Sequence, residues 1–110
     1  MAGVQQCPDI LAFRNDLAWL LATSADDRSR DGVRAVELAT AVVSESPSDD
    51  PGFLDTLAAA YAETGDFVSA TRISARALER LEAQRADEAT LGMYREHLTA
   101  FEAGRPIRDD

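Results

Sequence analysis

Four residues in the stretch "DDRSRDGVRAVEL" have the types and spacing with which a calcium-binding loop begins. Asp27, Ser29 and Asp31 would supply the first, third and fifth ligands, and Gly32 would allow the sharp turn at the sixth position. The twelfth position, where such a loop needs a bidentate glutamate, is Leu38. The ligand count therefore predicts no metal site, and the stretch is interpreted as an extended, charged turn.

The chain offers little else for catalysis. Its single histidine, His97, lies off the apolar stripe of its predicted helix, with no nucleophile at a spacing that would engage it, and is interpreted as a surface residue. All eleven cationic residues are arginine, which removes lysine Schiff-base chemistry. Neither a glycine-rich phosphate loop nor a paired-cysteine metal site is present. We therefore expect a non-enzymatic protein without a cofactor.

Composition limits the class of protein and its partners. The 110 residues, 45% of them hydrophobic, predict a single folded domain spanning residues 1–110. A net charge of −9 disfavours binding to nucleic acid and to anionic membranes, which attract clustered cations. Cys7 is the only cysteine, and nothing resembles a signal peptide or a membrane-spanning run. We expect a cytoplasmic protein whose partners are neutral or basic.

Helical periodicity accounts for most of the chain, and no segment alternates as a strand would, which predicts an all-α protein. An aspartate precedes four of the expected helices as a capping residue, and a glycine ends the third. The expected helices cover residues 10–23, about 32–45 after Asp31, from Pro51 after Asp50 to Gly65, from Asp66 to about 84, and about 87–103, opened by Asp87 and closed by Gly104 and Pro106.

Apolar stripes at helical spacing predict which residues face the core. In chain order they are Ile10, Phe13, Leu17, Leu20 and Leu21; Ala35, Leu38, Ala39 and Val42; Leu54, Leu57, Ala58 and Tyr61; Phe67, Ala70, Ile73, Ala77 and Leu81; and Leu91, Tyr94, Leu98 and Phe101.

The first and third expected helices are related by an internal repeat. A shift of forty residues aligns "RNDLAWLLA" with "LDTLAAAYA", matching Leu17 with Leu57 and Ala18 with Ala58. A helix pair of this kind cannot cover its own apolar face, so the pairs should stack, and the fifth helix should cover the end of the stack.

This repeat resembles the tetratricopeptide repeat (TPR) family. Residues 51–84 match its 34-residue pattern, and residues 10–45 form a looser repeat with an extended turn at 24–31. The matching positions are Leu54, Leu57, Ala58, Tyr61, Ala70 and Ala77, and the pattern is broken at Ser74 and Glu82. The order of motifs is similar to the terminal repeats of longer bacterial TPR proteins. The resemblance implies a right-handed helix-turn-helix solenoid with two helix pairs and a capping helix at about 87–103.

The resemblance also implies a protein-interaction scaffold in which the first helix of each pair lines a concave groove. The helical wheel places Trp19 opposite the predicted core stripe, as a groove position requires. An acidic, alanine-floored groove with one tryptophan favours a basic or apolar peptide or protein segment. In the alternative, Trp19 packs over Ala59 and Ala62 of the next helix. The groove residues are Asn15, Trp19, Thr23, Asp55, Ala59, Ala62, Glu63 and Glu96.

Two further features leave alternatives open. Arg72, Arg76 and Arg80 recur four apart on the outward side of their helix. They form either a solvated convex face, where a nearby carboxylate relieves the repulsion between like charges, or an anionic docking surface. Two helix pairs are fewer than a stack usually needs, so the alternative function is a structural or self-associating module, as a homodimer or the end of a longer array.

Overall fold

The computed structural model describes residues 8–46 and 48–109, with side chains from Ile10 onward. Its regular elements are five helices, and the described residues contain no strand. The predicted all-α class is therefore confirmed. The helices are α1 (Pro8–Thr23), α2 (Gly32–Glu45), α3 (Pro51–Glu63), α4 (Phe67–Ala83) and α5 (Glu88–Glu102), each within two residues of its expected bounds.

Aspartate caps begin four of the helices, as the sequence predicted. The carboxylates of Asp31, Asp50, Asp66 and Asp87 accept hydrogen bonds from backbone N–H groups in the first turns of α2, α3, α4 and α5. Hydrogen bonds from Ser69 lower the pKa of Asp66, and those from Thr90 lower the pKa of Asp87.

Gly65 ends α3 at a φ of +88°, which permits the Asp66 N–H to bond to the Tyr61 carbonyl at 3.0 Å. This left-handed end, expected from the sequence, turns the chain directly into α4.

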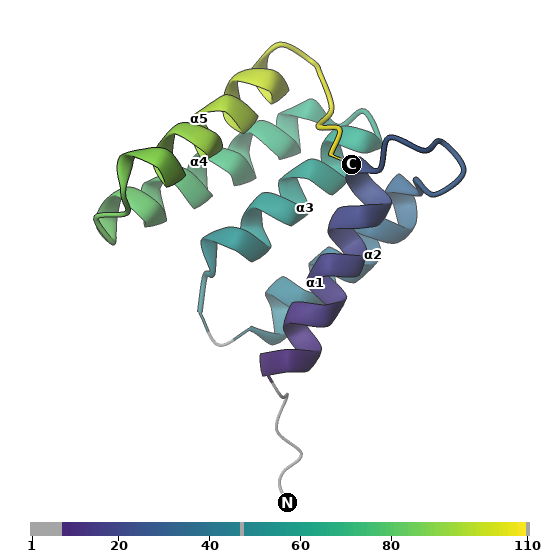
Figure 1. Cartoon of the computed structure of the whole chain (residues 1–110), viewed down its shortest axis with the longest axis horizontal. Coiled ribbons are helices and arrows are strands. Elements are labelled where there is room, and N and C mark those ends of the chain that lie inside the picture. Colours follow the sequence, from purple (N-terminus) through teal and green to yellow (C-terminus); the bar gives the residue numbers. More distant parts are fainter. Residues whose placement is uncertain (1–7, 47, 110) are drawn as a thin grey trace, which may run out of the picture.

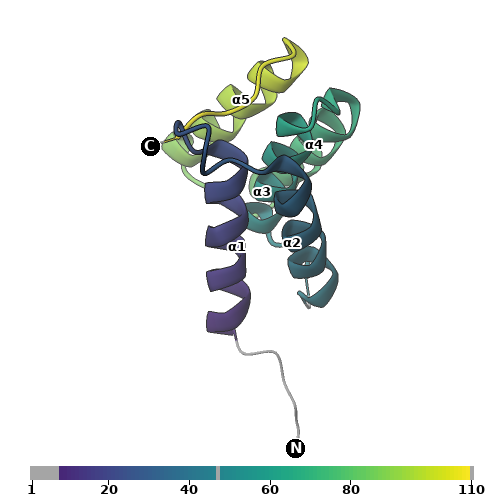
Figure 2. The ribbon, with the colours of Figure 1, turned by 90° about the vertical axis from the view of Figure 1, so that its right-hand side faces the viewer.

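Each helix packs against the next one in the chain, and α1 also packs against α3. Figure 1 shows α3 in the middle of the molecule, between the α1–α2 pair and the α4–α5 pair, and Figure 2 shows α1 beside α2 from a second direction. Because α3 has neighbours on several sides, every residue from Leu54 to Ala60 is buried. Most of these residues are small, which lets the surrounding helices approach closely.

The predicted inner face of α1 is wrong at three of its five positions, whereas Leu17 and Leu21 are half-buried and Leu21 packs on the core. Ile10, Phe13 and Leu20, which were expected in the core, are 45%, 71% and 51% exposed. The buried residues of α1 instead include Ala18 and Ala22, both fully covered. Since α1 is apolar on more than one side, periodicity alone cannot choose the buried stripe. The stripe of Ala18 and Ala22 allows α2 and α3 to come close, whereas Ile10, Phe13 and Leu20 face out.

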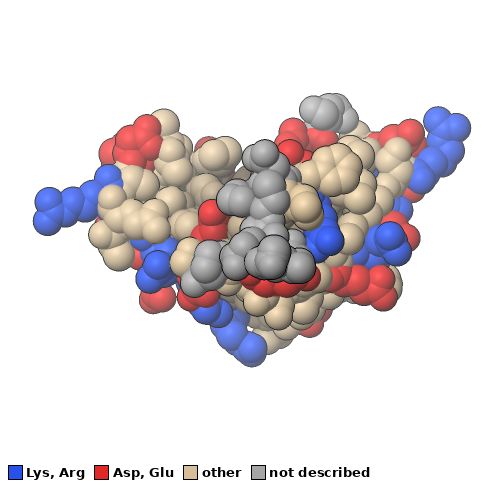
Figure 3. All heavy atoms as spheres, turned by 90° about the horizontal axis from the view of Figure 1, so that it is seen from below, with Lys and Arg blue, Asp and Glu red and all other residues tan. Residues whose placement is uncertain are grey.

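The arginines of α4 lie on the molecular surface. Arg72, Arg76 and Arg80 are exposed, and Arg76 pairs with Asp49, a carboxylate in the loop before α3. The prediction that a nearby carboxylate relieves the repulsion among these arginines is thus confirmed for Arg76. On the face seen in Figure 3, arginines and acidic residues are interspersed over the described part of the chain. None of the described helices has the length and apolar character that crossing a bilayer requires.

Candidate binding surface

Side chains from three helices meet where α5 approaches α1 and α3. His97 Nδ1 of α5 lies 2.9 Å from Asp55 Oδ2 of α3 and 3.1 Å from Asp55 Oδ1. The His97 ring is 5.8 Å from the Trp19 ring of α1 and 6.2 Å from the Tyr94 ring, measured between centroids. We call these four residues, Trp19, Asp55, Tyr94 and His97, the three-helix junction.

The sequence-based interpretation of His97 as a surface residue is wrong. The side chains of His97 and Asp55 are only 16% and 8% exposed. Burial lowers the pKa of His97, but the hydrogen bond and charge of Asp55 outweigh it, together with the charges of Glu96 and Asp109. The net pKa of His97 is raised. When it is protonated, the ring forms an ion pair with a buried carboxylate that joins α5 to α3.

The junction also keeps Tyr94 neutral. Burial, with the negative charges of Asp55 and Asp50, raises the Tyr94 pKa to about 12. An aspartate bonded to Nδ1 of a histidine is half of a general-base arrangement. Among the described residues, however, His97 has no hydroxyl or thiol hydrogen-bond partner. The pair therefore contributes a polar contact between α5 and α3, and it has no nucleophile among the described residues to activate.

The chain after α5 returns across this part of the molecule. Residues 105–109, which we call the return segment, have no regular secondary structure and run from the end of α5 toward the C-terminal end of α1 (Figures 1 and 2). Its Asp109 N–H donates to the Thr23 carbonyl at 2.8 Å, and Asp109 Oδ2 accepts from Trp19 Nε1 at 2.8 Å. Ile107 packs against a cluster that contains Ala22, Ala59 and Ala62.

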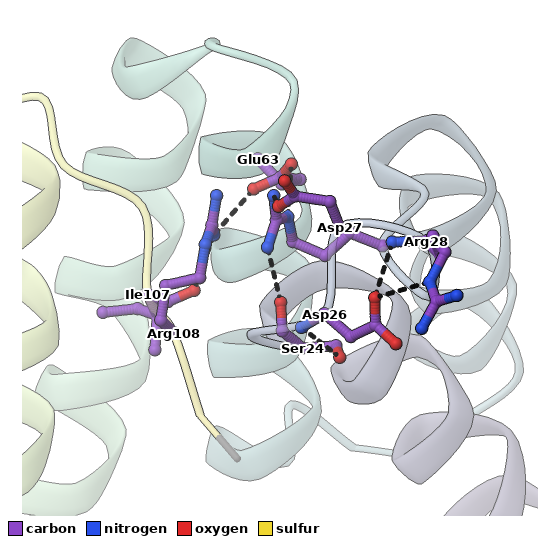
Figure 4. Close-up of polar contacts among 8 residues, drawn as sticks. Ser24, Asp26, Asp27, Arg28, Glu63, Ile107 and Arg108 are labelled. Atoms are coloured by element: carbon purple, nitrogen blue, oxygen red, sulfur yellow. Dashed lines mark hydrogen bonds and ion pairs between the residues drawn. The ribbon is translucent and has the colours of Figure 1, made fainter.

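Glu63, at the end of α3, joins the return segment to the turn between α1 and α2. Arg108 Nη1 lies 2.8 Å from Glu63 Oε1, and Arg30 Nε donates to Glu63 Oε2 at 3.2 Å. Arg30 also donates to the Ser24 carbonyl at 2.7 Å and pairs with Asp27. Figure 4 shows Glu63 between the turn and the return segment. One carboxylate thus receives a guanidinium on each side.

In the turn that resembled a calcium loop, the carboxylates are bonded to nearby groups of the turn and of α2. Asp27 is engaged by Arg30, Asp31 caps α2 through the Arg34 N–H, and Asp26 accepts from the Arg28 backbone. Within residues 8–46 and 48–109, no cluster of three or more His, Cys, Asp or Glu residues could hold a metal ion. The extended turn serves instead to bring Arg30 to Glu63.

The structure gathers most of the predicted groove positions around the return segment. Thr23, Asp55, Ala59 and Ala62 are buried, Asn15 and Glu63 are half-buried, and Glu96 is exposed. Trp19 is half-buried and packs against the cluster of Ala59 and Ala62, as the packing alternative expected. The surface expected to stand open is therefore partly covered by the chain itself.

Several residues of this surface escaped the sequence analysis. Arg30, Ile107, Arg108 and Asp109 reach it from the turn and from the end of the described chain, and Asp55 meets His97 across 42 positions of sequence. The local signal for the return segment was Ile107, a single aliphatic residue between two arginines after Pro106. Single aliphatic residues are common on protein surfaces, so this signal alone does not place the segment.

Comparisons of the chain with models of protein families, with curated proteins and with solved structures found no match.

Proposed function

We propose that the chain is a non-catalytic, TPR-like interaction module that binds an irregular or extended peptide across α1, α3 and α5. The helix contacts support a stack of pairs, because α1 packs on both α2 and α3, α3 packs on α4, and α4 packs on α5. Repeat stacks of this kind present one helix of each pair along a shared face. The ligand is a protein or peptide segment of basic or apolar character.

One observation carries the proposal: a peptide segment of that chemistry already lies on this surface. The return segment reads "RPIRD" and places Ile107 on the alanine cluster and Arg108 on Glu63. Its backbone bonds to Thr23, and its last described residue bonds to Trp19. The surface therefore has an apolar floor, a carboxylate, a backbone carbonyl acceptor and an indole donor within the span of one short peptide.

A peptide-display selection tests the proposal. Random seven-residue peptides are selected on the immobilised native chain, and the affinities of the enriched peptides are measured for the native chain and for Glu63→Gln. We expect enrichment of peptides that combine an aliphatic residue with arginine. Arg108 and Glu63 form a partly exposed ion pair, and such pairs stabilise by about 0.2–1 kcal/mol, so Glu63→Gln should weaken these peptides about two- to fivefold.

Arg80→Gln is the control, because Arg80 is exposed on α4 and lies outside this surface. It should leave the affinities unchanged. Charge reversal at Asp55 is avoided, since Asp55 is buried against His97 and its loss would disturb folding. Enriched peptides that bind Glu63→Gln as tightly as the native chain would contradict the proposal.

A second candidate function, self-association, is favoured by the exposed apolar face of α1. In an antiparallel pairing of two α1 helices centred on Asn15, residues whose numbers sum to thirty lie opposite each other. Phe13 would then face Leu17 of the second copy. Ile10 would face Leu20. The face is thus complementary to itself in its apolar positions.

Sedimentation velocity over a range of concentrations tests this pairing. We expect a weak dimer that Phe13→Glu abolishes and that Val68→Glu leaves intact, because Val68 is equally exposed, at 71%, but lies on α4. A face of one four-turn helix is smaller than a standard interface of about 800 Å² per partner, so the dimer should be weak. A sedimentation coefficient independent of concentration would rule out self-association.

A further inference from the structure

The return segment touches the candidate surface through three successive residues. Ile107 packs on the alanine cluster, Arg108 Nη1 lies 2.8 Å from Glu63 Oε1, and Asp109 bonds to Trp19 Nε1 at 2.8 Å. Each contact differs in chemistry from the next. The surface therefore recognises an ordered pattern, an aliphatic residue followed by a guanidinium and then a carboxylate.

The surface holds these recognition groups in place without the return segment. Glu63 keeps one oxygen on Arg30, whose side chain is 15% exposed and is itself fixed by the Ser24 carbonyl. The Trp19 ring packs on the alanine cluster and lies 5.8 Å from the His97 ring, measured between centroids. The binding groups are thus pre-organised by the turn and the three-helix junction.

The return segment itself is held by contacts that can be exchanged. Its Arg108 side chain is 38% exposed, Arg105 and Asp109 are exposed, and it forms no regular secondary structure. Exposed ion pairs and single hydrogen bonds stabilise only weakly, and segments with few buried contacts open locally at low cost. A competing segment with the same pattern can therefore take its place.

We propose that residues 105–109 are an intramolecular competitor of the binding surface, and that the partner displaces them with an extended segment reading aliphatic residue, arginine, acidic residue. This inference rests on the proposed function. It assigns the sequence pattern of the ligand. It also makes the return segment a regulatory contact, since the partner binds only molecules whose return segment has opened. The apparent affinity equals the intrinsic affinity multiplied by the fraction of molecules whose return segment is open.

Trp19 provides a direct readout of the docked segment, because it is the only tryptophan in the chain. The full-length variant Ile107→Ser/Arg108→Glu removes two of the three contacts, and Arg105→Glu is a matched control at an exposed position of the same segment. We expect a red shift of Trp19 emission in the double variant and none in the control. Circular dichroism verifies that the helices persist. An unchanged spectrum in the double variant would show that the segment is not docked on Trp19.

Competition is measured with a fluorescein-labelled peptide, GRPIRDD, which repeats residues 104–110. If the segment is docked in 90% or more of native molecules, the peptide should bind the double variant about tenfold or more tighter than the native chain. It should also reverse the red shift of Trp19. The peptide GRPIEDD, which lacks the second arginine, should bind both chains weakly.

The outcomes separate the two proposals. Equal binding of GRPIRDD to both chains, weakened in Glu63→Gln, would overturn the competitor and leave the proposed function standing. Binding of GRPIEDD as tight as that of GRPIRDD would overturn the assigned pattern. Binding of GRPIRDD to neither chain would overturn both proposals, because the opened surface would then take no peptide of this chemistry.

Discussion

Replacing Phe101 with alanine is expected to lower the free energy of unfolding by about 3–5 kcal/mol. Phe101 is the largest of the fully buried side chains, at 1% exposed, and it belongs to the cluster on which Ile107 packs. Its loss leaves a cavity in the cluster where α5 packs with α3 and α4. Urea denaturation followed by circular dichroism measures the change. A domain of this size is only marginally stable, and Phe101→Ala could unfold it. Phe101→Leu, which should lower the free energy of unfolding by about 1 kcal/mol, is a milder variant whose loss can still be measured.

Phe13→Ala is the matched control for Phe101→Ala. Periodicity placed both phenylalanines in the core, whereas the structure leaves Phe13 71% exposed. The control should change the free energy of unfolding by no more than about 0.5 kcal/mol at protein concentrations where the chain is monomeric. Equal losses in the two variants would show that the outward face of α1 is buried in solution.

Removal of the Asp55–His97 pair is expected to produce the second large effect, and it should depend on pH. The folded-state pKa of His97 is raised above the unfolded value of about 6.5, so the protonated form stabilises the fold. Its contribution, about 1.5–3 kcal/mol for a hydrogen bond to a charged group, is fully present below about pH 6.5. It is lost as the pH rises through the folded-state pKa. The stability difference between the native chain and His97→Gln should therefore narrow with increasing pH.

Proton NMR follows this titration directly, because His97 is the only histidine. Its ring resonance should titrate with a midpoint above 6.5 in the native chain, and Asp55→Asn should move the midpoint downward, since Asp55 supplies the main raising contributions. Glu96→Gln should have a smaller effect of the same sign, because Glu96 acts only through its charge. A native midpoint at or below 6.5 would contradict the paired, protonated His97.

Helix existence and bounds followed from local rules. Aspartate caps and Gly65 act within one turn of their own positions, so the sequence predicted them and the structure confirms them. The buried stripes of α2 and α3 were also predicted correctly at Ala35, Ala39, Leu54 and Leu57, where one face is clearly more apolar or smaller than the others.

The candidate surface was only partly predictable. Trp19 and Glu63 were placed on it from the helical wheel and the repeat, because helix faces follow from spacing. The Asp55–His97 pair and the Glu63–Arg108 pair join positions far apart in the chain, and no spacing rule encodes such contacts. His97 was therefore misassigned to the surface.

Composition and capping chemistry were enough to predict an acidic, all-α chain and the ends of its helices. Tertiary packing sets which face of α1 is covered, because alanine and leucine stripes are both apolar and the choice between them depends on how closely α2 and α3 approach. It alone also decided that the return segment lies on Glu63 and Trp19, since that contact depends on where the end of α5 directs the chain.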